Sequence, residues 1–453
     1  MHGTPDHSST AGTNLLRILG LGFGLAVVVG GTIGVSIFRL PGPIAELLGS
    51  VWLLMAIWVA GGIYTLASAN LMSELAAMLP RAGGVYVFVH RAFGAFPGFA
   101  VGWISWLGDT AAVSFMCIAF GEFSISLFSF STVPVWALAT CLLFAIAALN
   151  AAGIRVGSRF QQFLSVLKAF SLIAFVAACF VFGGSADTTT VTSTIAQPAT
   201  PIALLTALIL SFQLIIGAYG GWTSTVYFSE EDVDPGRNIP RALHLGVLAV
   251  IVIYLLVNAG LIYALPLSEL AGSKLAAADA MTRIFGSSGG RIVTALAIIS
   301  VVGIVNVVVM YLPRALYGLG RDGFFSMSAT KVSSGGTPLM ALSVTTLVAL
   351  VLILIGTFEM LMAVYAFFSV ALNILITGSL FALRKSEPDL VRPFRVWGYP
   401  ILPAVLLLVQ VALFFGFIFA DPITSGIAQV ALALSFPVFL LVRSRSTGQS
   451  GGA

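Results

Sequence analysis

The sequence predicts an all-α integral membrane protein with twelve transmembrane helices. Of its 453 residues, 59% are hydrophobic and 8% are charged, whereas a soluble globular protein carries about 25% charged residues. Several apolar runs exceed the roughly 20 residues that a helix needs to cross a bilayer. Two of these runs contain clustered glycines, which indicates interrupted helices. The composition excludes an ordinary soluble protein, and the scattered basic residues form no patch for nucleic acid.

Hydropathy places the spans at regular intervals along the chain. In chain order they are residues 15–40, 50–78, 94–121, 133–151, 160–183, 201–230, 242–266, 289–317, 338–356, 360–384, 400–420 and 424–442. An even number of spans puts both termini on one side. Most Lys and Arg residues fall on that side, and only Lys274, Arg283 and Arg291 lie in the opposite loops. The positive-inside rule therefore predicts that both termini are cytoplasmic. We expect the protein to lie in the cell membrane.

Two spans interrupt their own helices. The first contains VVVGGTIGVSIFRLPG (27–42), and the sixth contains GAYGGWTST (217–225). Backbone groups left unpaired in lipid cost several kcal/mol each, so an interruption needs a reason. For a single glycine-rich span, close helix packing through small residues is as good an explanation as an unwound binding site. The two spans begin successive sets of five with opposite orientation. Glycine interruptions at matching places of inverted repeats indicate the central site of a transporter.

The chemistry of such a site suits an amino acid. Free amides at the start of a half-helix attract an anionic group, and unwound carbonyls accept hydrogen bonds from an ammonium. The α-carboxylate and α-ammonium of an amino acid match these two polarities.

Seven motifs run in order over nearly the whole chain. They are TIGVSIF (32–38) with Pro41, PRAGGVYVF (80–88), AFGAFPGFAVGW (92–103), AYGGW (218–222), EEDVDPGRNIPRAL (230–243), LYGLGRDGFF (316–325) with TP (337–338), and RPFRVWGYPILP (392–403). Together they resemble the amino acid–polyamine–organocation (APC) permeases, close to the L-type amino acid transporter branch. The resemblance implies a five-plus-five inverted-repeat (LeuT-like) core with discontinuous helices one and six, two further C-terminal helices, and secondary transport of amino acids or related amines.

The predicted organisation has four parts. Residues 1–14 form a disordered cytoplasmic tail, with no cleaved signal peptide. Residues 15–384 form the transporter core, and residues 385–443 form helices eleven and twelve. Residues 444–453 form a second cytoplasmic tail.

The resemblance also implies a substrate site. It puts the substrate carboxylate on the backbone amides of Val35 and Ser36, and the ammonium on carbonyls near Thr32 and around Ala218–Gly221. The expected substrate-binding residues are Thr32, Ile33, Gly34, Val35, Ser36, Ile37, Ala218, Tyr219, Gly220, Gly221 and Trp222.

Two positions depart from the family pattern. Ser36 stands where the family usually has glycine, so its hydroxyl adds a contact or narrows the pocket. Gly217 stands where an aromatic gate is common. This departure predicts a roomier site or a gate from elsewhere, for which Tyr219 and Trp222 are the candidates.

Lys168 lies about two turns into the fifth span, within QQFLSVLKAFSLIAF. A lysine at the centre of a membrane helix costs roughly 2.5–3.5 kcal/mol, so its ammonium needs protein or water around it. It either snorkels toward the surface beside Arg155 and Arg159 or braces the unwound carbonyls of Gly30–Gly34. The resemblance favours the brace, because related permeases carry a lysine here in place of a sodium ion used by more distant members. We expect Lys168 to couple conformation, and a proton, to substrate occupancy.

Asp109, within GWISWLGDTAAVSF of the third span, is the other deep charge. An intramembrane carboxylate is a functional candidate by default. It is either a hydrogen-bonded packing group or a counter-charge that favours a cationic substrate.

Three further charged features are open at this level. Arg39 follows the first interruption on its outward side and either attracts anions or reaches the headgroups. Glu122, at a span end, is expected to be structural or solvated. The acidic run 230–234 faces Arg237 and Arg241. It is either a solvated helix end with caps or, as the resemblance suggests, a cytoplasmic gate of ion pairs.

Other classes of function find less support. The three cysteines have no paired spacing, the four histidines lie in tails or at span ends, and no metal or nucleophile motif occurs, so we expect no enzyme, metal or cofactor. A channel would show a repeated filter or charged rings, and a non-transporting sensor with a transporter fold is a further alternative.

The sequence thus predicts a secondary amino acid transporter working by alternating access. A neutral L-amino acid is the first choice of substrate, and a cationic amino acid or polyamine is the alternative. Proton symport and amino acid exchange both fit. The expected partners are the small-molecule substrate, protons and the lipid bilayer, with no nucleic acid and no partner subunit inferred.

Overall fold

A computed structural model describes residues 15–130, 132–184 and 198–450 of the chain. The predicted N-terminal tail therefore lies outside the described residues. Within them the structure is helical, with no β-strand and one isolated bridge between Leu19 and Asp232. This agrees with the all-α prediction.

Ten helical segments of the described chain are long and apolar enough to cross a membrane. They are α1–α2 (Leu21–Arg39), α4 (Val51–Met78), α6 (Ala95–Phe128), α8 (Ile154–Phe182), α9 with η2 (Pro201–Glu231), α10 (Pro235–Ala264), α13 (Ser287–Arg321), α15 (Phe358–Ser386), α16 (Ile401–Ala420) and α17 (Pro422–Ser450). The last of these continues into the segment predicted as a tail.

Two more predicted spans are apolar helices of 17 residues each, α7 (Val135–Ala151) and α14 (Leu339–Ile355). Short helices make the connections: α3 (Pro41–Leu48), α5 (Tyr86–Phe93), α11 (Leu267–Ala271), α12 (Ala276–Phe285) and η3 (Met327–Thr330). Every apolar segment expected from the sequence thus falls on a helix.

Local sequence signals set several helix ends. Ser50 and Thr200 cap α4 and α9 by accepting hydrogen bonds from the amides of Leu53 and Ala203, as small hydroxyl residues do at N-caps. Proline occupies the first position of α9 and α10, where its missing N–H costs nothing.

The first span breaks within its predicted segment. The helix α1 (Leu21–Thr32) ends with Ile33 in an extended conformation, at φ −73° and ψ 102°, and α2 begins at Ser36. Gly30 and Gly31 stay helical, so the break lies just beyond them.

The sixth span breaks in the same manner. The helix α9 (Pro201–Ala218) ends at the Tyr219–Gly221 turn, and the chain continues as the 3-10 helix η2 (Trp222–Glu231). A 3-10 stretch inside a span marks a departure from regular helix geometry.

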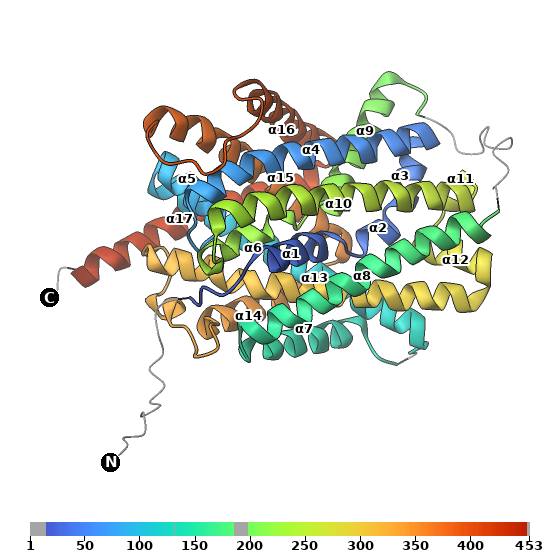
Figure 1. The fold of residues 1–453 in the computed structure, drawn as a ribbon, viewed down its shortest axis with the longest axis horizontal. Coiled ribbons are helices and arrows are strands. Elements are labelled where there is room, and N and C mark those ends of the chain that lie inside the picture. Colours follow the sequence, from blue (N-terminus) through green and yellow to red (C-terminus); the bar gives the residue numbers. More distant parts are fainter. Residues whose placement is uncertain (1–14, 131, 185–197, 451–453) are drawn as a thin grey trace, which may run out of the picture.

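The helix α1 lies in the interior of the molecule. Figure 1 shows it flanked by α8, α10 and α13, against which it packs. The outer helices instead expose large apolar side chains such as Trp52, Phe170 and Phe419. This inside-out distribution suits a protein surrounded by lipid, and it leaves the first broken helix at the protected centre.

Candidate functional site

The two interrupted helices meet at their breaks. Gly221 has φ +95°, a left-handed conformation that side chains rarely adopt, and a Cβ on it would lie 2.3 Å from the carbonyl oxygen of Gly31. The hydroxyl oxygen of Tyr254 on α10 lies 2.8 Å from the carbonyl oxygen of Thr32 and 3.0 Å from that of Ala218, so its one hydrogen is within donating distance of both. The carbonyls expected to hold an ammonium are therefore bridged to each other by one hydroxyl.

Lys168 braces the first break. Its side chain is 2% exposed, and Nζ donates to the carbonyl oxygens of Gly30 at 2.9 Å and Ile33 at 3.0 Å. These bonds pair backbone groups that the end of α1 leaves free. The contact is the brace expected from the sequence, and the ammonium does not extend toward the headgroups.

The backbone N–H donors at the first break, unlike its carbonyl acceptors, are unpaired. The backbone amides of Val35, Ser36 and Ile37 donate to no acceptor among the residues that the structure describes. All three residues are at most 5% exposed, and buried amides without a partner are rare in folded proteins. These amides are available to a ligand carboxylate.

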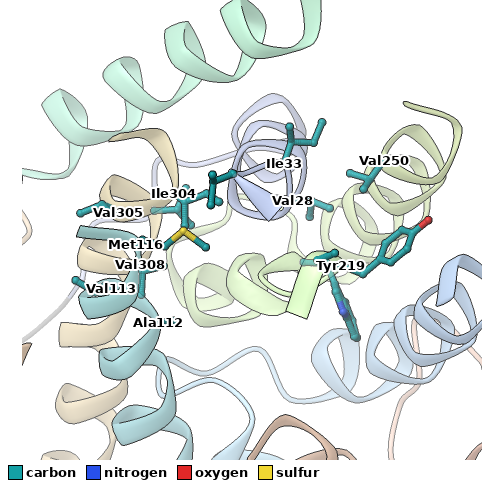
Figure 2. Close-up of a cluster of buried hydrophobic side chains, with 14 of the residues drawn as sticks. Val28, Ile33, Ala112, Val113, Met116, Tyr219, Val250, Ile304, Val305 and Val308 are labelled. Carbon is teal, nitrogen blue, oxygen red and sulfur yellow. The ribbon is translucent and has the colours of Figure 1, made fainter. Parts of the chain in front are cut away.

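A cavity of about 30 Å³ adjoins this break, which is room for about two water molecules. Gly31, Thr32 and Ser36 contribute its polar wall. Its apolar wall comes from α6 and α13, where Figure 2 shows the side chains gathered: Ala112, Met116, Ile304 and Val308.

A second cavity, of about 60 Å³, lies on the other side of the Gly220–Gly221 turn. Polar side chains from α4, α6, η2 and α15 line it: Tyr64, Thr65, Ser105, Asp109, Thr223, Tyr227, Tyr365, Ser369 and Asn373. The two cavities share Asp109, Tyr365, Gly220 and Gly221 as walls.

Asp109 lies where both cavities meet. No basic side chain of the described residues lies within 4 Å of its carboxylate. Tyr311 lines the first cavity together with Asp109, and its ring stacks on Tyr227 at 4.6 Å. A carboxylate without a counter-charge at membrane depth is costly, so this position suits a cationic ligand group.

The predicted site residues divide into two groups. Those that line a cavity are Thr32, Ser36, Asp109, Tyr219, Gly220, Gly221 and Trp222. Those that line neither cavity are Ile33, Gly34, Val35, Ile37, Ala218 and Lys168.

The two gate candidates, Tyr219 and Trp222, both line the second cavity. Tyr219 is 1% exposed and packs against the rings of Trp58 and Tyr254, so it is fixed in the core. Tyr365 of α15 instead lies at the walls of both cavities, and a Cβ on Gly220 would lie 2.7 Å from its hydroxyl. The sequence did not point to Tyr365, since only the fold brings α15 to the break.

Arg39 closes the end of the molecule beyond the first break. Its guanidinium lies 3.3 Å from the carboxylate of Glu122 on α6 and 3.0 Å from that of Glu359 on α15. It also stacks over the ring of Phe358 at 4.3 Å. Arg39 therefore ties three helices together, and Glu122 is its partner.

The acidic run that ends η2 has other partners than expected. Glu231 is fully buried and makes two hydrogen bonds to Arg314 of α13, at 2.7 and 3.2 Å, and Glu230 binds Arg321 at 2.9 Å. The expected pairing with Arg237 and Arg241 is absent among the described residues. Arg237 and Arg241 lie in the first two turns of α10, where both are exposed.

A third ion pair lies beside this run. Asp322 accepts from Arg81 at 3.1 Å and from the hydroxyl of Tyr86 on α5 at 2.6 Å. Burial, together with Asp322, raises the pKa of Tyr86, because both disfavour the phenolate.

Comparison with known proteins identifies the family. The family model described as amino acid permease matches residues 21–441. The serine/threonine exchanger SteT of Bacillus subtilis is 25% identical over 96% of this chain and 99% of its own length.

Two mouse proteins are similar over most of their length. The b(0,+)-type amino acid transporter 1 is 26% identical over 94% of this chain and 88% of its own length. The large neutral amino acids transporter small subunit 2 is 27% identical over 96% and 82%. These relatives are transporters and not enzymes, and the chain itself belongs to the amino acid permease family of the APC superfamily.

Proposed function

We propose that this protein is a secondary active transporter that moves amino acids across the cell membrane by alternating access. In this proposal all twelve apolar segments cross the bilayer, both termini are cytoplasmic, and spans one to five and six to ten form inverted repeats. The concentration of basic residues in the loops on one side supports that orientation.

One observation carries the proposal. Three buried amides without a partner lie at the first break, at Val35, Ser36 and Ile37. Of these residues Ser36 lines a cavity that the second break also lines. A substrate carboxylate would satisfy these donors. Thr32 lines the same cavity, and its carbonyl and that of Ala218 each keep a lone pair beside the bond from Tyr254 for an ammonium.

The first substrate class proposed is a neutral L-amino acid. The apolar wall of the first cavity, with Met116, Ile304 and Val308, suits an aliphatic side chain. The name of the mouse large neutral amino acids transporter points in the same direction.

A second class is supported by Asp109. Its carboxylate has no basic partner among the described residues and lies where the two cavities join. A cationic side chain reaching from the first cavity into the second would meet it. Cationic amino acids or polyamines are therefore the alternative substrates.

The ion pairs at the two ends suit the gates of an alternating-access cycle. Arg39 with Glu122 and Glu359 closes one end, and Arg314 with Glu231 closes the other. The cavities between them have room for only a few water molecules, so an amino acid enters after one set of pairs opens. Lys168 lies between the ends and, in this proposal, couples the opening to occupancy.

Uptake into proteoliposomes tests the function. The purified protein is reconstituted and offered a panel of labelled amino acids and amines, with and without a pH gradient and with and without internal amino acid. Saturable uptake is expected. A requirement for internal amino acid identifies exchange, and acceleration by an inward proton gradient identifies symport.

Three outcomes would count against the proposal. Uptake that does not saturate indicates a channel. Substrate binding without uptake indicates a sensor. Failure to bind or transport any amine-bearing compound removes the assignment altogether.

A further inference from the structure

The helices α1 and α8 form a seam that is closed at one end and open at the other. At the closed end Lys168 bonds to α1, and one turn away Ser165 Oγ donates to the carbonyl oxygen of Ala26 at 2.7 Å. At the open end, where both helices begin, lies a cavity of about 400 Å³. Its walls are residues 18–23 with Arg155, Ser158, Arg159 and Gln162.

The cavity carries two positive charges without a counter-charge. Arg155 and Arg159 are exposed, and neither guanidinium makes a hydrogen bond or ion pair with any residue in the described part of the chain. No acidic residue is among the residues that line the cavity. Two guanidinium groups four residues apart on a helix repel each other, and a phosphate group matches their fork of donors.

The backbone adds to this chemistry. The first turn of α1 belongs to the cavity wall, and its amides at Leu21, Gly22 and Phe23 have no partner among the described residues. A Cβ on Gly22 would meet nothing within 4 Å, so the space beside this turn is open. An anion held by the two arginines can therefore also interact with the start of α1.

The surface below the cavity is apolar and exposed. Following Arg155 and Arg159 on α8 come Phe163, Val166, Phe170 and Ile173, which are 64%, 57%, 70% and 59% exposed. With 3.6 residues per turn, all six lie on one stripe of the helix. Since α8 is long and apolar enough to span the membrane, this stripe faces acyl chains and its basic start lies at headgroup depth.

We propose that the open end of the α1–α8 seam binds an anionic phospholipid, with its phosphate on Arg155 and Arg159 and its acyl chain along Phe163, Val166 and Phe170. Charge complementarity selects an anionic headgroup, and the adjoining stripe selects a lipid over a soluble phosphate. The bound headgroup would join the start of α1 to α8, as Lys168 joins them at the other end of the seam. This inference does not depend on the transported substrate.

Thermal unfolding of the full-length protein in detergent micelles tests the site. Phosphatidylglycerol should raise the midpoint of unfolding, while phosphatidylcholine and millimolar inorganic phosphate should leave it nearly unchanged. The double variant Arg155→Gln/Arg159→Gln should bind phosphatidylglycerol about 30-fold more weakly, because each basic residue near an anionic surface contributes about 1 kcal/mol.

The chain offers a matched control. Arg237 and Arg241 are also four residues apart at the start of a membrane helix, are exposed, and have no side-chain partner among the described residues, but they lie outside the cavity. The variant Arg237→Gln/Arg241→Gln should keep the full response to phosphatidylglycerol.

Several results would overturn the proposal. Phosphatidylcholine could stabilise the protein as much as phosphatidylglycerol, the Arg155/Arg159 variant could respond like the parent, or free phosphate could give the whole effect. If the variant does not fold, native mass spectrometry of the unmodified protein tests the site instead. The proposal then requires that the protein retain phosphatidylglycerol in preference to phosphatidylcholine.

Discussion

Gly303 on α13 leaves the space that the ammonium of Lys168 occupies. A Cβ built on Gly303 would lie 2.6 Å from Nζ and 2.7 Å from Cε of Lys168. The lysine therefore reaches the carbonyls of Gly30 and Ile33 only because the facing helix carries no side chain at this point.

This relationship gives a paired prediction for transport. Lys168→Ala removes the ammonium, and Gly303→Ala displaces it while keeping its charge. Both should lower the initial uptake rate about tenfold or more, since a hydrogen bond from a charged group contributes about 1.5–3 kcal/mol. Uptake is measured in proteoliposomes across a range of pH.

The control is Gly426→Ala, since a Cβ on Gly426 would meet nothing within 4 Å. A Lys168→Ala protein that transports normally, with an unchanged pH profile, would show that the brace has no part in coupling.

The contact between the two breaks should not tolerate a side chain. Gly221→Ala combines the unfavourable φ of +95° with a Cβ 2.3 Å from the carbonyl oxygen of Gly31. We expect a loss of about 1–3 kcal/mol in stability from the strained backbone alone, visible as a lower unfolding midpoint, together with impaired uptake. A Gly221→Ala protein as stable and active as Gly426→Ala would contradict the observed contact.

Asp109→Asn separates the two proposed substrate classes. Lysine and norleucine differ chiefly by a terminal ammonium. The ratio of the lysine uptake rate to the norleucine uptake rate therefore reports on a counter-charge in the site. If Asp109 binds a cation, the ratio should fall about tenfold, as expected for the loss of one charge-assisted hydrogen bond, while norleucine uptake changes little.

An unchanged ratio would make Asp109 a packing group in the cavity wall beside Tyr311. Loss of uptake of both compounds would point to a structural role as well.

The buried pair of Glu231 and Arg314 should be costly to break. The two side chains are 0% and 2% exposed, and removing one partner leaves an uncompensated charge, which costs about 3–5 kcal/mol. Glu231→Gln and Arg314→Met should each lower the unfolding midpoint strongly, and the double variant should recover part of the loss.

The exposed pair of Glu269 and Arg283 is the matched control, with a contact of 2.7 Å and exposures of 54% and 44%. The equivalent changes there should cost no more than about 1 kcal/mol. Equal losses of stability at the two pairs would mean that burial does not raise the cost of breaking the Glu231–Arg314 pair.

The sequence predicts much of the fold because the bilayer restricts the choices. A span needs a minimum apolar length, so segments such as 50–78 and 400–420 differ from the observed helices by about one residue. The breaks were also predictable, since glycine clusters are costly in a helix. The exact turn was not, because Gly30 and Gly31 remain helical and the chain turns at Ile33.

The site was less predictable, because its contacts join distant segments. Tyr254 and Gly303 carry no local motif, and their importance appears only when α10 and α13 pack on α1. A tyrosine in a membrane span was the one available signal for Tyr254, since a buried hydroxyl seeks a partner. The partners of Glu231 could not be chosen from sequence, as several arginines lie within reach along the chain.

The hydroxyl of Tyr254 has a single hydrogen and two carbonyl acceptors, one on each interrupted helix. At any instant the stronger bond goes to Thr32 or to Ala218, and the other oxygen is left more electron-rich. A ligand ammonium that binds one carbonyl would push the hydrogen toward the other. Through Tyr254, ligand binding at the carbonyl of one broken helix would change the hydrogen bonding of the other, without any movement of the backbone.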